Sequence, residues 1–173
     1  DDGTVTIDVA APPYCWAPMG IPFYGTSFTQ LSVAANGRVT FGGADSDFSP
    51  TLAEAVTDNA FVGFWTDFNP SVGGNISITN PAADLIRVQW SNVPYFGEPA
   101  MANNFGIEFN VMTGAVKIDS LINVQPNPLT SLSSSDRQFL GMSPGNLLGA
   151  TDPGVAPFAA AAVGSAGAAT DML

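Results

Sequence analysis

The chain has 173 residues, of which 46% are hydrophobic and only 11% are charged, and its formal net charge is −11. It contains no histidine and a single cysteine, Cys15, which excludes a histidine general base, a Ser-His-Asp triad, a Cys/His zinc site and a disulfide within the chain. The charge also disfavours nucleic-acid binding, because four Lys and Arg residues cannot displace many counterions from phosphates.

The length predicts one domain with a core of its own, since domains average about 150 residues. A folded chain of this size exposes roughly 8,000 Å², yet only 19 residues, 4 basic and 15 acidic, are charged. Two explanations stay open. Either small polar residues cover the surface, as in many secreted proteins, or neighbouring copies cover part of it, because obligate interfaces contain few charges.

Apolar residues that alternate with polar ones, between turn residues, predict strands from one end of the chain to the other. The first strand is expected over residues 5–9, and prolines break regular structure over 12–22. Residues 31–41 alternate on both sides of Asn36-Gly37. This pair predicts a hairpin with a type I′ turn, because both residues tolerate a positive φ.

The middle of the chain combines a short helix, a buried strand and a second hairpin. Residues 51–57 follow a proline and favour one or two helical turns. Residues 61–65 are apolar on both faces, which predicts a central strand covered on two sides. A second hairpin is expected over 76–90, with its turn at Asn80-Pro81.

A third hairpin is expected over residues 105–118, with its turn at Thr113-Gly114. Residues 123–136, rich in proline and serine, predict a long loop, and 139–142 predict the last strand of the core.

About nine short strands with almost no helix predict an all-β fold. We expect an antiparallel β-sandwich, jelly-roll-like or a flattened barrel, over residues 1–150. An extended Ala/Gly-rich tail follows over 151–173.

Six segments of the chain are similar to one known module. They are FYGTSF at 23–28, LSVAANGRVTFG at 31–42, AFVGFWTDF at 60–68, VQWSNVP at 88–94, the hairpin around a Gly turn at 105–118, and LGMSPG at 140–145. Together they resemble a β-sandwich module of secreted and surface proteins of bacteria, in which an F-Y-G entry leads into a V-x-x-N-G-x-x-x-F hairpin. The animal nidogen-like domain is similar in outline.

The resemblance covers about residues 20–150. It implies an extracellular β-sandwich with an architectural, adhesive or sugar-facing role, usually without catalysis. Phe68 stands where the module has a second acidic residue after the tryptophan, and the tail after about residue 150 has no counterpart.

Three features bear on compartment. The sequence begins with two aspartates and a glycine, as expected of a secreted chain whose signal peptide has been removed. Cys15 is expected to be a small buried hydrophobic residue, with a bridge to another chain as the alternative. No membrane span is expected, because the uncharged residues 154–170 are mainly Ala, Gly and Ser and are interrupted by Pro157.

One group of acidic and amide residues raises the question of calcium: Asp45, Asp47, Asp67 and Asn69. Calcium prefers several oxygen ligands held by loops, and Asp45 and Asp47 supply alternate carboxylates in a Gly-rich loop. Because no complete ligand loop is present, we expect capping or solvated roles, with a bound calcium ion as the alternative, and no cofactor. Asp67 is expected to form hydrogen bonds at a strand end.

A second group lies on the third hairpin. Glu108 and Asp119 are expected to share a face with Asn110 and Lys117, with Lys117 opposite Asn110. Two such carboxylates can hydrolyse a glycoside, and a Lys117–Asn110 isopeptide bond is another option. We expect instead a cross-strand charge pair that involves Lys117, and no enzymatic activity.

The aromatic residues divide into core and surface. Trp65 and Trp90 alternate with their strands and are expected in the core. Tyr14 and Trp16 lie between prolines, so we expect them to be exposed, where they are possible contacts for an extracellular glycan.

The tail is small, apolar and without a helical or strand pattern, and its candidate assembly residues are Val155, Phe158, Ala160, Ala162 and Val163. It either folds back on its own domain or adds a strand to the sheet of a partner. In the second case a head-to-tail contact produces an open filament when the rotation does not close.

These observations favour a structural, self-assembling subunit of an extracellular filament or surface layer, whose partners are copies of itself. The alternative is a secreted carbohydrate-binding or adhesion module that acts as a monomer.

Overall fold

A computed structural model describes residues 1–122, 138–148 and 170–172 of the chain. Its strands are β1 (Thr4–Asp8), β2 (Ile21–Phe23), β3 (Thr26–Phe28), β4 (Gln30–Ala34), β5 (Arg38–Phe41), β6 (Ala60–Trp65), β7 (Asn75–Ala82), β8 (Leu85–Tyr95), β9 (Glu98–Asn110), β10 (Val116–Ile122), β11 (Phe139–Ser143) and β12 (Thr170–Met172). The helical elements are α1 (Leu52–Thr57) and a 3-10 turn, η1 (Gly145–Leu148).

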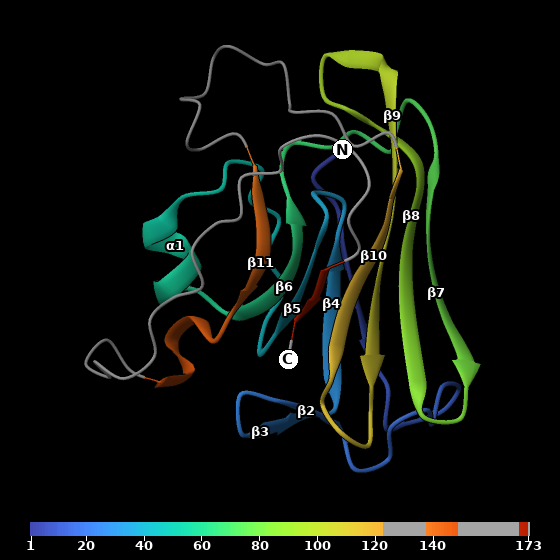
Figure 1. The fold of residues 1–173 in the computed structure, drawn as a ribbon, viewed down its shortest axis with the longest axis vertical. Helices are drawn as coiled ribbons and strands as arrows, with labels where there is room; N and C mark the ends of the chain where they lie inside the picture. The colour runs from blue at the N-terminus through green and yellow to red at the C-terminus, as the bar shows by residue number, and fades with distance from the viewer. Residues whose placement is uncertain (123–137, 149–169, 173) are drawn as a thin grey trace.

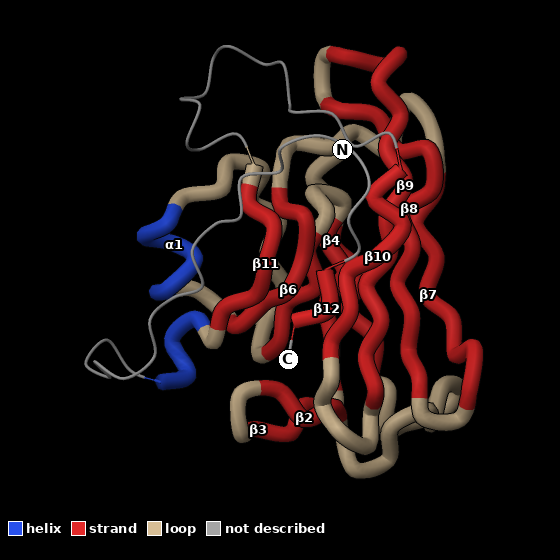
Figure 2. The backbone as a smooth tube through the Cα atoms, viewed as in Figure 1, coloured by secondary structure: helices blue, strands red, loops and turns tan. Residues whose placement is uncertain are grey.

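Two antiparallel five-stranded sheets form the fold (Figures 1 and 2). Sheet 1 has the order β1-β4-β5-β6-β11, and sheet 2 has the order β12-β10-β9-β8-β7. The short β2–β3 ribbon lies at one end of the sandwich. The predicted all-β sandwich is confirmed, and because the sheets do not share a strand they form a sandwich and not a barrel.

The main core lies between the two sheets and is rich in aromatic rings. Trp90 stacks on Phe105 with ring centroids 4.7 Å apart, and Phe64 meets Phe105 edge to face at 5.6 Å. All three side chains are fully buried. Such pairs add about 0.5–1.5 kcal/mol each to the free energy of burial.

A second, smaller core covers the outer face of sheet 1, where Phe61 and Trp65 of β6 pack with Ala55 of α1 and Phe139 of β11. Every residue of β6 is buried, which confirms the expected central strand covered on both sides and the burial of both tryptophans. The short helix is also confirmed. It starts at the N-cap Thr51, whose hydroxyl accepts a hydrogen bond from the backbone N–H of Glu54.

The hairpin at Asn36-Gly37 is confirmed, but the type I′ turn is wrong. Only Gly37 has a positive φ, +82°, because three residues and not two connect β4 to β5. Asn36 does not adopt a positive φ but forms hydrogen bonds with its side chain. Its side-chain oxygen accepts from the N–H of Phe68, and its side-chain amide donates to the carboxylate of Asp2. A Cβ on Gly37 would lie 2.1 Å from the carbonyl oxygen of Phe64, so the position requires glycine.

The second hairpin is confirmed over β7 and β8, but its turn is not at Asn80-Pro81. Ala82 pairs with Leu85, so the turn lies at Ala83-Asp84, three residues later, and Pro81 sits in edge strand β7. The Asn80 amide donates to the carbonyl of Ala82 and helps to close the turn. A proline is tolerated there because an edge strand pairs on one side only.

The third hairpin, around Thr113-Gly114, and the last core strand, β11, are confirmed. The predicted loop over 123–136 lies outside the described residues, as do residues 151–169 and Leu173 of the tail. Residues 170–172 are described, and as β12 they pair with β10 of their own sheet. Within the described part of the chain, no helix is long and apolar enough to cross a membrane.

Candidate functional site

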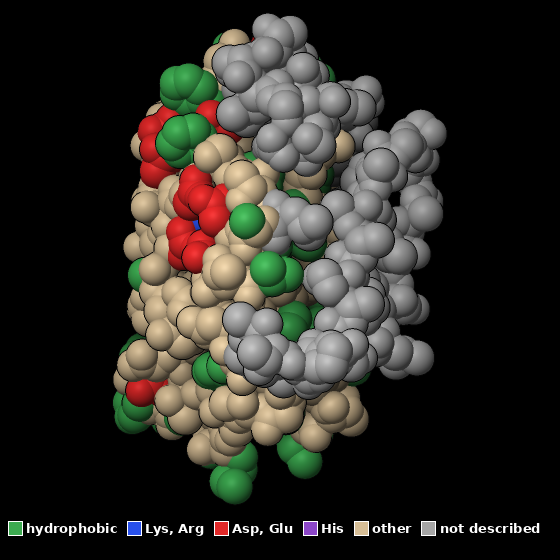
Figure 3. Space-filling view, turned by 90° about the vertical axis from the view of Figure 1, so that its left-hand side faces the viewer, with side chains coloured by type: hydrophobic (Ala, Val, Ile, Leu, Met, Phe, Trp, Pro, Cys, Tyr) green, Lys and Arg blue, Asp and Glu red, His purple; other side chains and the backbone are tan. Residues whose placement is uncertain are grey.

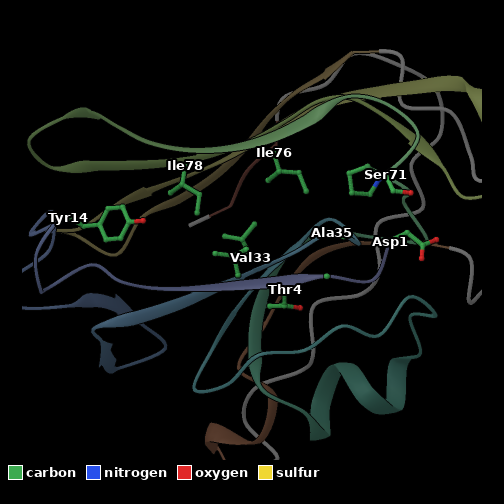
Figure 4. Close-up of a pocket in the computed structure, with 11 residues that line it drawn as sticks. Asp1, Thr4, Tyr14, Val33, Ala35, Ser71, Ile76 and Ile78 are labelled. Atoms are coloured by element: carbon green, nitrogen blue, oxygen red, sulfur yellow. The ribbon is translucent and has the colours of Figure 1, made fainter.

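An apolar cleft of about 680 Å³ opens between β1 and β7, the strands at one edge of the two sheets (Figure 4). Its lining residues are Asp1, Gly3, Thr4, Val5, Tyr14, Val33, Ala35, Pro70, Ser71, Ile76 and Ile78. A cleft of this size lies in the range of small-ligand and peptide sites in proteins.

On sheet 1, the cleft is lined by residues that the strand alternation turns towards the core. Val5 pairs in register with Val33, and Ile7 pairs with Leu31, so these four side chains share the inner face. Ile7 and Leu31 are buried, whereas Val5 is 61% exposed. The inner row of β1 is therefore covered at one end and open at the other.

Sheet 2 shows the same feature on the opposite wall. Ile76 pairs with Trp90 and Ile78 with Val88, so both isoleucines face inwards beside buried core residues. Both are only half-buried. In Figure 4, Ile76 and Ile78 project from β7 towards Val33 across the cleft.

Among the described strands, those that border the cleft each pair with one neighbour, β4 for β1 and β8 for β7. An edge strand leaves every second N–H and C=O without a strand partner, and proteins usually protect it with lysine or other charges. Across β1 and β7 the one charged residue is Asp8, and Pro81 is the one proline. Little in these two strands discourages pairing with another chain.

Polar groups mark the two ends of the cleft: Tyr14 lies at one end, and Asp1 and Ser71 lie at the other (Figure 4). Near the second end, Asp67 is 9% exposed. Burial first, and the nearby carboxylate of Asp2 second, raise the pKa of Asp67 to about 6. Asp67 does not itself line the cleft, and its raised pKa is a property of this buried carboxyl.

The glycan candidates Tyr14 and Trp16 are half-buried and pack against the main core. Their rings are 4.8 Å apart at an interplanar angle of 65°, so they meet edge to face and do not form one flat platform. Cys15, between them, is exposed, so the expected burial of this residue is wrong. It sits in a tight turn with a φ of +48°.

The loop that carries Asp45 and Asp47 contacts Arg38, a buried arginine that the sequence analysis did not identify. The Arg38 side chain is 1% exposed, lies 3.7 Å above the Trp65 ring, and pairs with Asp45 at 2.5 Å. Asp45 and Asp47 also cap their own loop, each accepting from the backbone N–H two residues on. Acidic side chains gather on this side of the molecule (Figure 3).

The calcium alternative gains no support, because Asp45 is paired with Arg38 while Asp67 lies beside Asp2. Among the described residues, no group of three or more acidic, Cys or His side chains is placed to hold a metal ion.

The charged residues of the third hairpin are arranged differently from the prediction. Lys117 pairs in register with Glu108, not with Asn110, and Asp119 pairs with Gly106. The Lys117–Asn110 arrangement is therefore wrong, because the register is shifted by two residues. Lys117 still forms an ion pair, with Asp119 at 3.5 Å along its own strand.

Arg87 of β8 was missed, and it links both carboxylates. Its guanidinium lies 2.6 Å from Asp119 and 3.5 Å from Glu108. Hydrogen bonding to Asp119 raises the pKa of Arg87. The two carboxylates considered for glycoside hydrolysis are thus both paired with Arg87, and Lys117 supplies the second positive charge that balances them.

The five candidate assembly residues, Val155, Phe158, Ala160, Ala162 and Val163, lie outside the described residues. The cleft itself was not predicted. The alternation at Val5, Ile76 and Ile78 signals inward-facing residues, but only the order of strands shows that β1 and β7 are edges.

In comparison with known proteins, a family model described as NIDO related matches residues 4–167 of the chain. No curated protein and no solved structure matches the chain.

Proposed function

The chain belongs to the NIDO-related family, and from this premise we propose that it is a structural subunit that assembles with copies of itself in an extracellular filament or surface layer. The expected nidogen-like outline is confirmed by the family match, which indicates an extracellular β-sandwich module. The assembly, and the absence of an enzymatic role, are the proposed part.

The observation that carries the proposal is the open edge of the sandwich. Inward-facing apolar residues, with Val5 the most exposed of them, stay uncovered between two edge strands. Exposed apolar surface costs about 25 cal/mol per Å² relative to burial, so covering this edge stabilises the molecule. A second copy can cover it.

The low charge of the chain supports the same proposal. Only 19 of the 173 residues are charged, and among the described ones Arg38, Arg87 and Lys117 are held in ion pairs. Soluble proteins average about 25% charged residues. Because salt screens the repulsion between the net charges of two copies, a surface with so few charges does little to prevent the copies from associating.

The second candidate is a carbohydrate-binding or adhesion module that acts as a monomer. It is favoured by Tyr14, whose ring lines one end of the cleft beside Trp16. In this case the cleft would hold part of a glycan and no assembly would form.

Light scattering over a concentration series, followed by electron microscopy, separates the two candidates. Growth of the mass beyond a dimer, with regular particles on the grid, supports the structural subunit. A constant mass of 17.8 kDa at every concentration and salt level overturns it. Retention of that monomer on a polysaccharide column, lost in Tyr14→Ala, would then establish the second candidate.

A further inference from the structure

The cleft sets clear requirements for what can fill it. Its walls are the apolar side chains of Val5, Val33, Ile76 and Ile78, and its mouth is bordered by the backbones of β1 and β7. An extended, uncharged peptide meets both requirements, because its backbone can pair with a strand edge while alternate side chains enter the cleft.

The chain itself contains such a segment. Residues 153–170 carry no charge, and within them 155–163 read VAPFAAAAV. In an extended conformation Phe158 shares one face with alanines at alternate positions, so a single large ring is flanked by small side chains. Nine residues extend over about 30 Å at about 3.3 Å per residue.

The described residues on either side of this segment attach to the opposite edge of the sandwich. On one side, η1 is fixed beside α1, where the N–H of Asn146 donates to the carbonyl of Asp58. On the other side, β12 pairs with β10. The cleft lies between β1 and β7, the strands at the other ends of the two sheets.

We propose that residues 155–163 of one copy add a strand to the cleft between β1 and β7 of the next copy, an inference that rests on the proposed self-assembly. Because the donor segment and the acceptor cleft are different parts of the chain, the contact is head to tail and each added copy presents a new free cleft. Contacts of this type form open filaments unless the rotation between copies closes a ring.

Two full-length variants, each damaged in one half of the contact, test the inference. Val5→Asp places a charge in the acceptor cleft, and Phe158→Asp places one in the donor segment. Each variant alone is expected to be monomeric by light scattering. A mixture is expected to give a 1:1 dimer and nothing larger, because the intact donor of one variant fits the intact cleft of the other.

Met112→Asp is the matched control. Met112 is 77% exposed on the β9–β10 turn and does not line the cleft, so this variant is expected to assemble like the parent chain. Val5 is itself mostly exposed, so Val5→Asp is expected to keep the parent circular dichroism spectrum.

A peptide titration keeps the inference testable whatever the assembly state. A fluorescent peptide of residues 153–166 is titrated with Phe158→Asp protein, whose cleft is intact, and then with Val5→Asp protein. Binding to the first is expected to be at least tenfold tighter than to the second, and tenfold tighter than that of the same peptide carrying Phe158→Asp.

The outcomes separate this inference from the proposed function. If the parent chain assembles and Val5→Asp assembles equally well, self-assembly stands and the strand-acceptor cleft is overturned. A mixture of the two variants that stays monomeric, or a peptide that binds neither protein, also overturns it. If the parent chain is monomeric under every condition, the proposed function fails.

Discussion

The buried Arg38 is expected to depend on the charge of Asp45 more than on any other single contact. Its guanidinium is almost fully enclosed, and burial lowers the pKa of Arg38, an effect that Asp45 opposes most strongly among the nearby carboxylates. Asp45→Asn removes this charge but keeps an oxygen that can accept from the N–H of Asp47. The loop is therefore retained while the ion pair is lost.

The expected cost follows from what remains around the cation. Removing one partner of a buried ion pair typically costs 3–5 kcal/mol. The Trp65 ring at 3.7 Å and the carbonyl of Asp47 at 3.3 Å still face Arg38, and Asp45 is partly exposed. We therefore expect a loss of about 3 kcal/mol, which for a chain of this size lowers Tm by about 6–12 °C.

A double-mutant cycle isolates the pair. Arg38→Met alone leaves Asp45 near solvent and is expected to cost about 1–2 kcal/mol, and combining it with Asp45→Asn is expected to cost little more, because no charge is then buried. Urea unfolding followed by circular dichroism, at a concentration where light scattering shows monomers, measures the four free energies. Costs of the two single variants that simply add up in the double variant would refute this reasoning.

Three further outcomes are expected, each measured by chemical denaturation. The pKa of Asp67 is raised from 3.8 to about 6 in the folded protein, so the folded state binds this proton more tightly and stability should rise as the pH falls from 7 towards 4. Asp67→Asn should raise the free energy of unfolding by about 1–2 kcal/mol at pH 7 and make it depend less on pH. If the free energies of the two proteins changed in parallel with pH, the raised pKa of Asp67 would be contradicted. Gly37→Ala should cost at least about 2–3 kcal/mol, because it adds a clash with the Phe64 carbonyl to the strain of a positive φ, while the control Gly25→Ala, with a φ of +78° and open space around it, should cost about 1 kcal/mol. Gly106→Ala would place a Cβ 2.2 Å from the Arg87 guanidinium and 2.8 Å from the side-chain oxygen of Gln89. It should cost about 1 kcal/mol alone and clearly less in an Arg87→Ala background, where only the flexible end of Gln89 stays close; equal costs in both would show that Arg87 is not the obstacle.

Local pattern was enough to locate most of the strands and two of the three hairpin turns. Alternation of side chains between two faces is a property of consecutive residues, so it is visible without knowledge of the fold. The misplaced turn at Asn80-Pro81 shows the limit. The turn that forms is three residues later, at Ala83-Asp84, where the Asp84 carboxylate accepts from the amide of Asn110, a contact between residues far apart in the chain.

The alternation of side chains predicts neither the register of the third hairpin nor the presence of the cleft. A shift of two residues keeps Glu108 and Lys117 on the predicted face but changes their partners. Arg87 enters this group from a third strand, β8. The openness of the cleft depends on which strands end each sheet, and the spacing of Val5, Ile76 and Ile78 is the same in an edge strand as in a central one.

The two broad faces of the sandwich differ, and this difference would carry over to any material built by joining copies at their edges. One face bears α1 and the acidic groups around Arg38, and the other bears the ladder of charges centred on Arg87. Where successive copies keep the same orientation, all the helices would project to one side. Such a ribbon would have one side that repels other polyanions and a reverse side, already neutralised, that they could approach.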